Sequence, residues 1–333
     1  MDRGPVFVAG IERSGTSLMY ALLASHPKIA MTRRTNLWRF FYNGYGDLSQ
    51  TENFERCLAA IMRYKRLRHL QPDPERLRRE FWQGEPTYAR LFTLLQEHNA
   101  ERLGKPRWGD KSLHTERYAD LIFAAYPTAR VIYMIRDPRD RYASSRSRWT
   151  KMRGLVGAGT AMWLDSLRWA QRDQRLYPDR CTIVRYETVV SQPEATLREV
   201  CAFLGEEYTP AMLTMEGAPS HRDQGGNSSY GRHEPGRITT VSIGRFRKVM
   251  SKGEIAFMQT YAGVDMVAQG YPPEQIRFSL GDRLLYVLAD WPANLLRMIG
   301  WRALEAMRER MGRVPSPGTI LPEAHTSWHK AGG

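Results

Sequence analysis

Residues 5–17, PVFVAGIERSGTS, decide the fold expected for this chain. The apolar run at residues 6–9 predicts a buried strand, and the pattern LMYALLASHP after the stretch predicts a helix. A tight glycine-bearing turn between a strand and a helix N-terminus directs backbone N–H groups, and the positive end of the helix dipole, at one point. The turn therefore predicts a phosphate site, although turns of this kind also serve purely structural roles.

The spacing of the glycines in this turn matches the nucleotide-triphosphate loop G-x-x-x-x-G-K-[ST] except at one position. Thr16 stands where that loop has its lysine, and the basic residue of the turn is Arg13. The turn keeps the cradle of N–H groups but lacks the lysine that reaches the outer phosphates of ATP. The ligand expected here carries a phosphate and is not ATP.

A second segment with the features of a binding site begins at residues 130–136, RVIYMIR, an apolar run typical of a buried parallel strand. Asp137 and Pro138 then predict an N-cap and the first position of a helix. Arg136 ends the strand, where open α/β sheets bind ligands, and Ser144 lies two turns into the helix. Both side chains suit a second phosphate. In the alternative, Arg136 pairs with a neighbouring aspartate, Asp137 or Asp140, and Ser144 only packs.

The two segments together, about 120 residues apart, resemble the sulfotransferases that use 3′-phosphoadenosine-5′-phosphosulfate. The resemblance implies that the first turn holds the 5′-phosphosulfate and that the second segment holds the 3′-phosphate through Arg136 and Ser144. Its implied 5′ loop consists of Arg13, Ser14, Gly15, Thr16 and Ser17.

Three further stretches resemble the same family, so that the resemblance runs from residue 5 to about residue 270. Residues 108–118, WGDKSLHTERY, resemble the segment that supplies a catalytic lysine, here Lys111. Residues 183–205 resemble the segment that would bring Tyr186 near the adenine, and residues 239–248 the loop that closes over the nucleotide, with Arg245 in its basic position. The implied catalytic cations are Arg13 and Lys111.

The general base is where this chain departs from the family. The tyrosylprotein-sulfating branch has a Gly-Glu-Glu after the His-Pro of its first helix and uses one glutamate as base, whereas this chain has Arg33 and Arg34 in that place. His114, three residues after Lys111, is a candidate base, although a structural role for it stays open. The weaker candidates are Glu85 and Asp110, and an acceptor that ionises without help is a further alternative.

The composition is that of a folded chain rather than a disordered one, in agreement with the resemblance. The chain has 333 residues, of which 42% are apolar and 25% charged, enough for a large core. We expect an α/β fold with a mainly parallel central sheet flanked by helices, in one domain over residues 1–280. Strands are expected at residues 6–9, 131–135 and 181–186, and helices at 15–25, 115–125, 138–148, 160–175 and from Pro193, with a capping box at Ser251 and a surface loop at 219–237.

The cysteines and the N-terminus predict the compartment. Cys57, Cys181 and Cys201 form no C-x-x-C pair, which fits reduced core residues. The first strand begins by about residue 5, which leaves no room for a signal peptide, and no stretch reaches the length of apolar residues that a spanning helix needs. The sequence thus predicts a cytoplasmic protein, with peripheral membrane contact as a possibility.

The net charge of +14 predicts anionic partners. Residues 32–108 form an expected acceptor-side insertion, mostly helical, in which arginines and aromatic residues stand together. Its candidate acceptor-binding residues are Arg33, Arg34, Trp38 and Glu85. This set suits a small-molecule or glycan acceptor with a ring-shaped or apolar body and an acidic group. The basic run at residues 63–79 belongs either to this surface or to a solvated helix face.

The tail lies past the resemblance. Residues 281–314 predict an amphipathic helical extension, interrupted by Pro292, and residues 315–333 predict disorder. The extension has three possible roles, since it can dock on the core, join two subunits as a homodimer, or lie on an anionic membrane.

The sequence as a whole predicts a sulfotransferase that moves a sulfuryl group from 3′-phosphoadenosine-5′-phosphosulfate to a hydroxyl or amine by in-line displacement. No metal is expected, because the sequence shows no metal-ligand motif. Two alternatives stay open. One is a P-loop phosphotransferase that uses ATP and Mg²⁺, and the other is a basic nucleic-acid-binding protein, for which no recognised motif is present.

Overall fold

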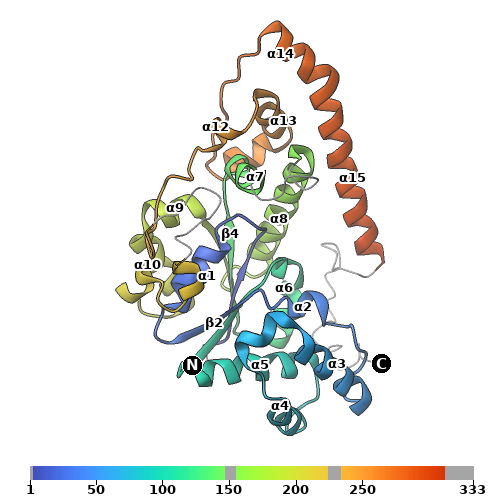
Figure 1. Cartoon of the computed structure of the whole chain (residues 1–333), viewed down its shortest axis with the longest axis vertical. Coiled ribbons are helices and arrows are strands. Elements are labelled where there is room, and N and C mark those ends of the chain that lie inside the picture. Colours follow the sequence, from blue (N-terminus) through green and yellow to red (C-terminus); the bar gives the residue numbers. More distant parts are fainter. Residues whose placement is uncertain (1–2, 147–154, 224–233, 312–333) are drawn as a thin grey trace.

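The structure is a computed structural model that describes residues 3–146, 155–223 and 234–311 (Figure 1). The expected disorder at 315–333, the end of the helix expected at 138–148 and the middle of the loop expected at 219–237 lie outside these residues. A single sheet of five strands stands at the centre, in the order β2-β3-β1-β4-β5, and all of its pairs are parallel. The strands are β1 (Val6–Ala9), β2 (Ile29–Arg33), β3 (Arg107–Lys111), β4 (Arg130–Ile135) and β5 (Cys181–Arg185).

Helices cover both faces of this sheet, which confirms the expected fold class. Along β1, Val6 and Val8 face one apolar cluster and Phe7 faces another, as the two-residue period of a strand requires. The first face carries α1 (Thr16–Ala24), α9 (Tyr186–Ser191), α10 (Pro193–Leu204), η3 (Pro210–Thr214) and α11 (Pro219–Arg222). The second carries α5 (Tyr88–Arg102), η2 (Thr115–Tyr118) and α6 (Ala119–Ala125).

The strands at β1, β4 and β5 were predicted from their apolar runs, but β2 and β3 were not. β3 reads RWGDK, and three of its five residues are charged. The strand is nevertheless fully buried, and the side chains of Arg107 and Asp110 have hydrogen-bond partners inside the protein. Arg107 donates to Glu206 at 3.1 Å and to the carbonyls of Gly4 and Leu204, while Asp110 accepts hydrogen bonds from two threonines. Burial of paired charges hides this strand from a hydrophobicity pattern.

The insertion between β2 and β3 is helical, as expected. It contains α2 (Leu37–Phe40), α3 (Thr51–Arg63), the 3₁₀ helix η1 (Lys65–Leu70) and α4 (Pro74–Phe81) before α5. Asp73 caps α4 by accepting from the N–H groups of Glu75 and Arg76. Trp38, Phe54 and Phe81 are buried and join the apolar cluster on the second face of the sheet. The insertion therefore extends the core and does not form a separate layer.

The remaining helices share an apolar cluster with Ile11 and Ile135, near the carboxyl ends of β1 and β4. They are α7 (Pro138–Arg146), α8 (Val156–Leu176), α12 (Phe246–Val249) and α13 (Lys252–Ala268). Ser251 and Glu254 form the expected capping box at α13, and Gly205 ends α10 with a φ of 72°, in the left-handed conformation that glycine favours.

A long helical arm completes the chain and runs along one side of the molecule (Figure 1). It consists of α14 (Leu280–Leu285), the π-helical turn η4 (Tyr286–Asp290) and α15 (Trp291–Arg310). Pro292 lies in the first turn of α15, where proline is tolerated, so the helical path continues through the expected interruption. One face of α15 packs on α8, and Arg117 pairs there with Glu305 at 3.1 Å and Glu309 at 3.4 Å. No helix among the described residues is long and apolar enough to cross a membrane.

Candidate functional site

All five strands end at the same edge of the sheet, and this edge gathers the candidate residues. The strand order places the loop after β1 in the middle, Arg136 and Tyr186 on one side of it, and Lys111 and Arg33 on the other. We call the ends of β1, β4 and β5 the nucleotide half of the edge, and the ends of β2 and β3 the acceptor half. Ligands of open α/β sheets bind at this edge.

The loop after β1 has an unusual backbone. Gly10, Arg13 and Gly15 have φ values of 120°, 71° and 93°. A positive φ is costly at Arg13, and such strain is maintained only where the surroundings fix it. The surroundings do so here, because Arg141 donates to the Glu12 carbonyl at 3.2 Å and to its carboxylate at 3.1 Å, and the Gly10 N–H donates to Glu116 at 3.3 Å.

The same loop presents hydrogen-bond donors to one point. The first turn of α1 carries N–H groups that have no acceptor within the helix, and its dipole places partial positive charge there. The hydroxyl of Ser14 is buried and has no hydrogen-bond partner in the described part of the chain. A buried hydroxyl without a partner is costly in a native protein. The donors of this loop suit an anion, as the sequence predicts, because an anion would complete these bonds.

The second predicted site meets the first. Arg13 donates through Nε to the Ser144 hydroxyl at 2.8 Å, and Arg136 donates to the Arg13 carbonyl at 3.3 Å. Residues of β4 and α7 thus contact the loop after β1 directly, although they lie more than a hundred residues away in the sequence. The structure brings the two predicted anion sites into one continuous site.

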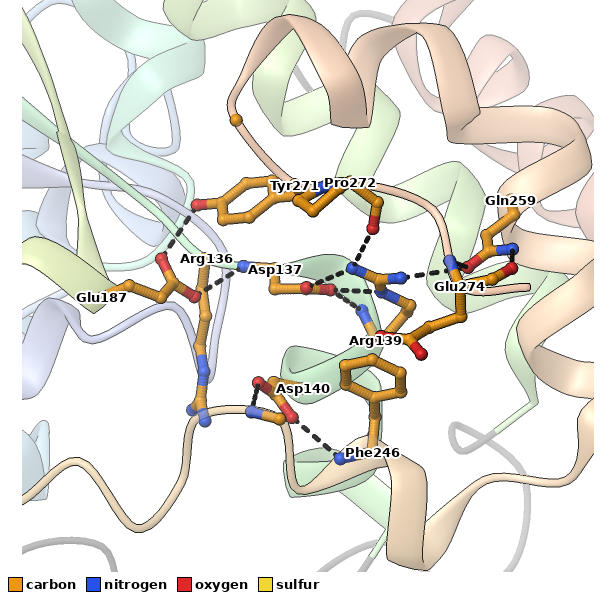
Figure 2. A network of polar contacts seen from close by, with 12 residues as sticks. Arg136, Asp137, Arg139, Asp140, Glu187, Phe246, Gln259, Tyr271, Pro272 and Glu274 are labelled. Atoms are coloured by element: carbon orange, nitrogen blue, oxygen red, sulfur yellow. Dashed lines mark hydrogen bonds and ion pairs between the residues drawn. The ribbon is translucent and has the colours of Figure 1, made fainter. Parts of the chain in front are cut away.

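The alternative pairing of Arg136 with its neighbouring aspartates is not what the hydrogen bonds show. Asp137 caps its own helix through the Arg139 N–H at 2.9 Å and holds the Arg139 guanidinium at 2.7 Å. Asp140 accepts from the backbone N–H groups of Gly244 at 2.6 Å and Phe246 at 2.9 Å. Both carboxylates are thereby engaged in holding α7 and the loop of residues 239–248 (Figure 2). Sequence reasoning did not find this role.

Figure 2 shows a second layer of polar contacts around these aspartates. Glu187 accepts from the Asp137 N–H at 2.9 Å and from the Tyr271 hydroxyl at 3.0 Å, which links the end of β4 to the start of α9. Arg139 donates to Gln259 at 3.0 Å and to the Pro272 carbonyl at 3.0 Å. The start of α7 is thus fixed from three directions, and with it the position of Arg136.

Tyr186 closes the nucleotide half. The Arg136 guanidinium lies over its ring at 4.3 Å from the centroid, and its hydroxyl bonds with the hydroxyl of Ser242 at 2.7 Å. Ser242 also accepts from Arg136 through its carbonyl at 2.9 Å. The predicted closing loop does reach the site, but the contact that the structure shows is made by Ser242. Arg245 lies three residues further on, at the N-cap of α12, and its contact with a nucleotide stays a prediction.

Lys111 ends β3 in the acceptor half and is buried. Burial, together with the nearby positive charge of Arg34 and Arg33, lowers the pKa of Lys111 to about 8. The backbone N–H of Arg34 donates to the Lys111 carbonyl at 2.7 Å, which joins the ends of β2 and β3. A cation near its pKa in a dry, positively charged place is suited to a ligand that brings negative charge.

Asp110, one of the weaker candidates for the general base, follows a different course from Lys111. It is adjacent to Lys111 in a strand and therefore points to the opposite face of the sheet. Its carboxylate accepts from Thr32 at 2.7 Å and Thr35 at 3.0 Å, and burial raises its pKa. The hydrogen bonds assign Asp110 to the link between β2 and β3.

Two histidines lie at the acceptor half. His114 has a φ of 65°, and burial together with the charge of Arg39 lowers its pKa to about 4, against the opposite effect of Glu12. His221, on α11, was not predicted. Burial, followed by the charges of Arg33 and Lys111, lowers its pKa to about 4 as well. Both imidazoles are therefore neutral near pH 7 and are weaker bases than an unperturbed histidine.

His221 is the histidine whose charge environment includes Lys111, since the charged groups that act on His114 are Arg39, Glu12, Arg117 and Arg308. Its segment is held in place by a hydrogen bond from the Arg33 guanidinium to the neighbouring Ser220 hydroxyl. No motif marks His221 in the sequence, because a distant loop brings it to the site.

The predicted acceptor residues occupy different environments. Arg34 is exposed and Arg33 is half-buried at the end of β2, whereas Trp38 is only 3% exposed and packs against the rings of Tyr42 and Tyr88. Glu85 is exposed, just before the N-cap of α5. Trp38 therefore lies in the apolar core of the insertion, and its contact with an acceptor stays a prediction.

The basic run at residues 63–79 is in part an ion-paired surface. Arg76 pairs with Glu80 at 2.7 Å and Glu101 at 2.7 Å, and Arg78 pairs with Glu55 at 2.8 Å. These arginines have carboxylate partners of their own, which favours the reading of a solvated helix face. The described residues contain no cluster of three or more potential metal ligands.

Comparisons with known proteins bear on this arrangement. The chain is 24% identical over 221 residues to the protein-tyrosine sulfotransferase of Drosophila melanogaster, covering 63% of this chain and 40% of that protein. It is 26% identical over 227 residues to protein-tyrosine sulfotransferase 1 of Danio rerio, covering 65% of this chain and 57% of that protein. The chain thus spans about half the length of these two curated relatives.

A solved structure has the same fold. The sulfotransferase domain of the Synechococcus PCC 7002 olefin synthase superposes with a TM-score of 0.53 at 19% identity, covering 78% of this chain and 96% of that one. The family model described as "Sulfotransferase family" matches residues 5–210, which contain the β1 loop, Lys111, Arg136 and Tyr186. The chain belongs to the sulfotransferase family.

Proposed function

We propose that this protein transfers a sulfuryl group from 3′-phosphoadenosine-5′-phosphosulfate to a hydroxyl or amine acceptor. The observation that carries the proposal is the junction of the two anion sites, in which Arg13 of the β1 loop donates to Ser144 and Arg136 donates to the Arg13 carbonyl. One nucleotide with phosphate at both its 5′ and 3′ positions fits two such sites side by side. ATP carries no 3′-phosphate, and the β1 loop lacks the lysine that an ATP site uses.

The donor would be held mainly by the nucleotide half. The N–H groups of the β1 loop and the hydroxyls of Ser14, Thr16 and Ser17 suit the 5′-phosphosulfate. Arg136 and Ser144 suit the 3′-phosphate, because a guanidinium and a hydroxyl give charge-assisted bonds to phosphate oxygens. Tyr186 offers a ring for the adenine beside them, and Arg245 stands on the loop that Asp140 anchors.

The residues at this edge of the sheet would contribute positioning and charge neutralisation to the reaction. The donor supplies an activated sulfuryl group, which an acceptor takes by in-line displacement with adenosine 3′,5′-bisphosphate as the leaving group. Arg13 on the β1 loop and Lys111 at the end of the neighbouring strand β3 would offset negative charge that grows on the leaving oxygen. A lysine with a pKa of about 8 is also able to give a proton there.

The proton of the acceptor requires a base or a sufficiently acidic acceptor. His114 remains a proposed base. His221 is a second proposed base, because the charges of Lys111 and Arg33 affect its pKa and Arg33 donates to the adjacent Ser220. Each would accept the proton as the neutral imidazole, but a pKa of about 4 makes it a weaker base than a group whose pKa lies near the working pH. Replacing each by alanine separates the two, since only the true base should be needed for an acceptor that does not ionise by itself, such as an alcohol. If both variants transfer the sulfuryl group to an alcohol at the wild-type rate, neither histidine is the base.

The acceptor is proposed to be a small molecule or glycan with an acidic group, rather than a basic peptide. The support is the pair Arg33 and Arg34 at the end of β2, close enough to Lys111 to lower its pKa. The cytoplasm is the proposed compartment, because Cys57, Cys181 and Cys201 are all free and buried.

A transfer assay with radiolabelled donor tests the activity. The protein is incubated with ³⁵S-labelled 3′-phosphoadenosine-5′-phosphosulfate and paired acidic and neutral acceptors, without Mg²⁺ and with a metal chelator. We expect label on an acceptor and release of adenosine 3′,5′-bisphosphate. Phosphorylation from ATP that depends on Mg²⁺, with no sulfuryl transfer, would instead establish the phosphotransferase alternative.

A further inference from the structure

The helical arm from α14 to α15 presents an apolar face to solvent. Leu280 is 83% exposed, Leu288 is 75% exposed and Leu296 is 70% exposed. More than half of each of Leu284, Ile299, Met307 and Met311 is exposed as well. At 1.5 Å per residue, the helix from Leu280 to Arg310 is about 45 Å long, so these side chains form an extended apolar stripe. An exposed stripe of this length marks an interaction surface.

The inner face of the same arm is already occupied. Asn294 and Met298 are buried, and the Asn294 side chain accepts from the Gly157 N–H at the start of α8 at 3.3 Å. The arm is therefore docked on the core through one face, and the apolar stripe is a second face that this docking leaves exposed.

The acidic residues of the arm contact either the core on its inner side or the N-terminus of α14. Glu305 and Glu309 pair with the buried Arg117, and Glu305 also pairs with Arg308. Ser279 caps α14 by accepting from the Asp282 N–H at 3.1 Å, and the exposed Asp282 carboxylate lies 3.6 Å from the Lys252 ammonium of α13. The Asp290 carboxylate lies beside Gly253 of α13. A Cβ added at Gly253 would be 3.0 Å from its Oδ2.

The exposed charges of α15 are therefore all positive. Arg297, Arg302 and Arg310 are exposed, while the acids of this helix, Glu305 and Glu309, face Arg117. Arg283 adds an exposed cation on α14. An apolar stripe flanked by arginines is the arrangement by which an amphipathic helix lies in the interface of an anionic bilayer, with arginine at the headgroups and leucine below them.

We propose that the outer face of α14 and α15 binds the surface of a membrane that contains anionic lipids. Charge complementarity selects this occupant over a second copy of the chain. Two α15 helices packed through their stripes would bring arginines close to arginines, with no acidic side chain of α15 on that face to pair with them. An anionic bilayer supplies both an apolar layer and the opposite charge.

The proposal is independent of the sulfuryl-transfer activity, since it concerns binding alone. Co-sedimentation of the full chain with vesicles tests it, comparing phosphatidylcholine vesicles with vesicles that also contain phosphatidylglycerol, at low and high salt. We expect binding to the anionic vesicles that weakens with salt, and little binding to the neutral ones.

Two variants and two matched controls assign this binding to the arm. The charge variant is Arg297→Gln, Arg302→Gln and Arg310→Gln, and the apolar variant is Leu288→Ser and Leu296→Ser. Because each arginine near an anionic surface changes the partition coefficient about fivefold, the charge variant should bind at least tenfold more weakly. Both controls carry substitutions at exposed positions elsewhere and should bind as the wild type does. The control for the charge variant is the triple variant Arg56→Gln, Arg68→Gln and Arg175→Gln. The control for the apolar variant is the double variant Leu103→Ser and Leu176→Ser.

Thermal unfolding of every variant shows whether it is folded, and light scattering of the free proteins gives their oligomeric state. Equal binding to neutral and anionic vesicles would overturn the proposal, as would a charge variant that binds as the wild type does. A wild-type dimer that the apolar variant converts to a monomer, with no vesicle binding by either, would assign the stripe to a second copy and also overturn it.

Discussion

The nucleotide half and the acceptor half of the sheet edge differ in how their functional groups are supported. In the nucleotide half, Ser14, Arg136 and Ser144 are buried, and the loops around them are hydrogen-bonded to one another. In the acceptor half, Arg34 is exposed and Arg33 is half-buried, and a long helical insertion forms the surroundings. Hydrogen bonds between loops thus fix the residues of the nucleotide half, whereas the two arginines of the acceptor half lie nearer the surface beside a helical insertion, with only Lys111 buried among these three cations.

Lys111 lies where the two halves meet, and its loss should have the largest effect. Lys111→Ala should lower kcat about a hundred- to a thousandfold, as is typical when a group that stabilises transition-state charge is removed. The affinity for adenosine 3′,5′-bisphosphate should change little, because the nucleotide half binds it. Steady-state kinetics and calorimetry measure the two quantities. Lys65→Ala, at an exposed lysine in the insertion, is the control. A loss of affinity equal to the loss of kcat would move Lys111 into the nucleotide half.

Gly15→Ala tests whether the nucleotide half is as tightly built as its contacts indicate. Gly15 has a φ of 93°, and a Cβ added there would lie 2.5 Å from the Tyr186 ring. We expect nucleotide affinity to fall at least tenfold, because strain and the displaced ring both disturb the cradle.

Gly104→Ala separates these two causes, since Gly104 also has a positive φ, of 63°, but has nothing within 4 Å of an added Cβ. It should affect stability alone. Normal nucleotide binding by Gly15→Ala, measured by calorimetry, would contradict the tight packing of Tyr186 on the loop.

The acceptor half is tested by Arg33→Ala combined with Arg34→Ala. The KM for an acidic acceptor should rise about tenfold, since charge-assisted bonds of partly exposed arginines are weaker than buried ones. The KM for its neutral analogue, and the donor affinity, should stay near the wild-type values. Arg63→Ala combined with Arg66→Ala is the matched control from the neighbouring basic run. If the control variant loses rate and the Arg33→Ala, Arg34→Ala variant does not, the basic run at residues 63–79 binds the acceptor instead of Arg33 and Arg34.

The pH dependence of the reaction should show the smallest effect. Lys111 is cationic below its pKa of about 8 and loses its charge as the pH rises through that value. The kcat/KM for the donor, which reports groups of the free enzyme, should therefore fall above about pH 8. Lys111→Arg should move this fall to higher pH, because an arginine keeps its charge. An unchanged profile in Lys111→Arg would assign the fall to another group.

The sequence predicts the nucleotide half better than the acceptor half, for a physical reason. The strands β1 and β4 are continuous apolar runs that end in glycine, arginine and serine, so the pattern gives both the fold and the ligand class. Three of the five residues of strand β3 are charged, and distant partners, such as Glu206 for Arg107, accompany the burial of Arg107 and Asp110. No local pattern contains that information.

Residues that act through long-range contacts were missed for the same reason. His221 comes to the acceptor half from a segment past β5, and Arg141 and Glu116 hold the β1 loop from elements far from it in the sequence. Ser242 lies inside the stretch that resembles the closing loop, but the prediction for that stretch named only the basic residue Arg245. A polar residue gives little sign in the sequence of whether it supports a site or contacts a ligand.

The central claim is that Arg136 and the β1 loop hold the two ends of one nucleotide. Isothermal titration calorimetry without Mg²⁺, with adenosine 3′,5′-bisphosphate and with adenosine 5′-monophosphate, tests it most directly in the wild type and in Arg136→Ala. We predict that the wild type prefers the bisphosphate and that Arg136→Ala weakens its binding about ten- to a hundredfold while binding of the monophosphate stays near the wild-type value, since a charge-assisted bond is worth about 1.5–3 kcal/mol. Equal affinity of the wild type for the two nucleotides would contradict the account.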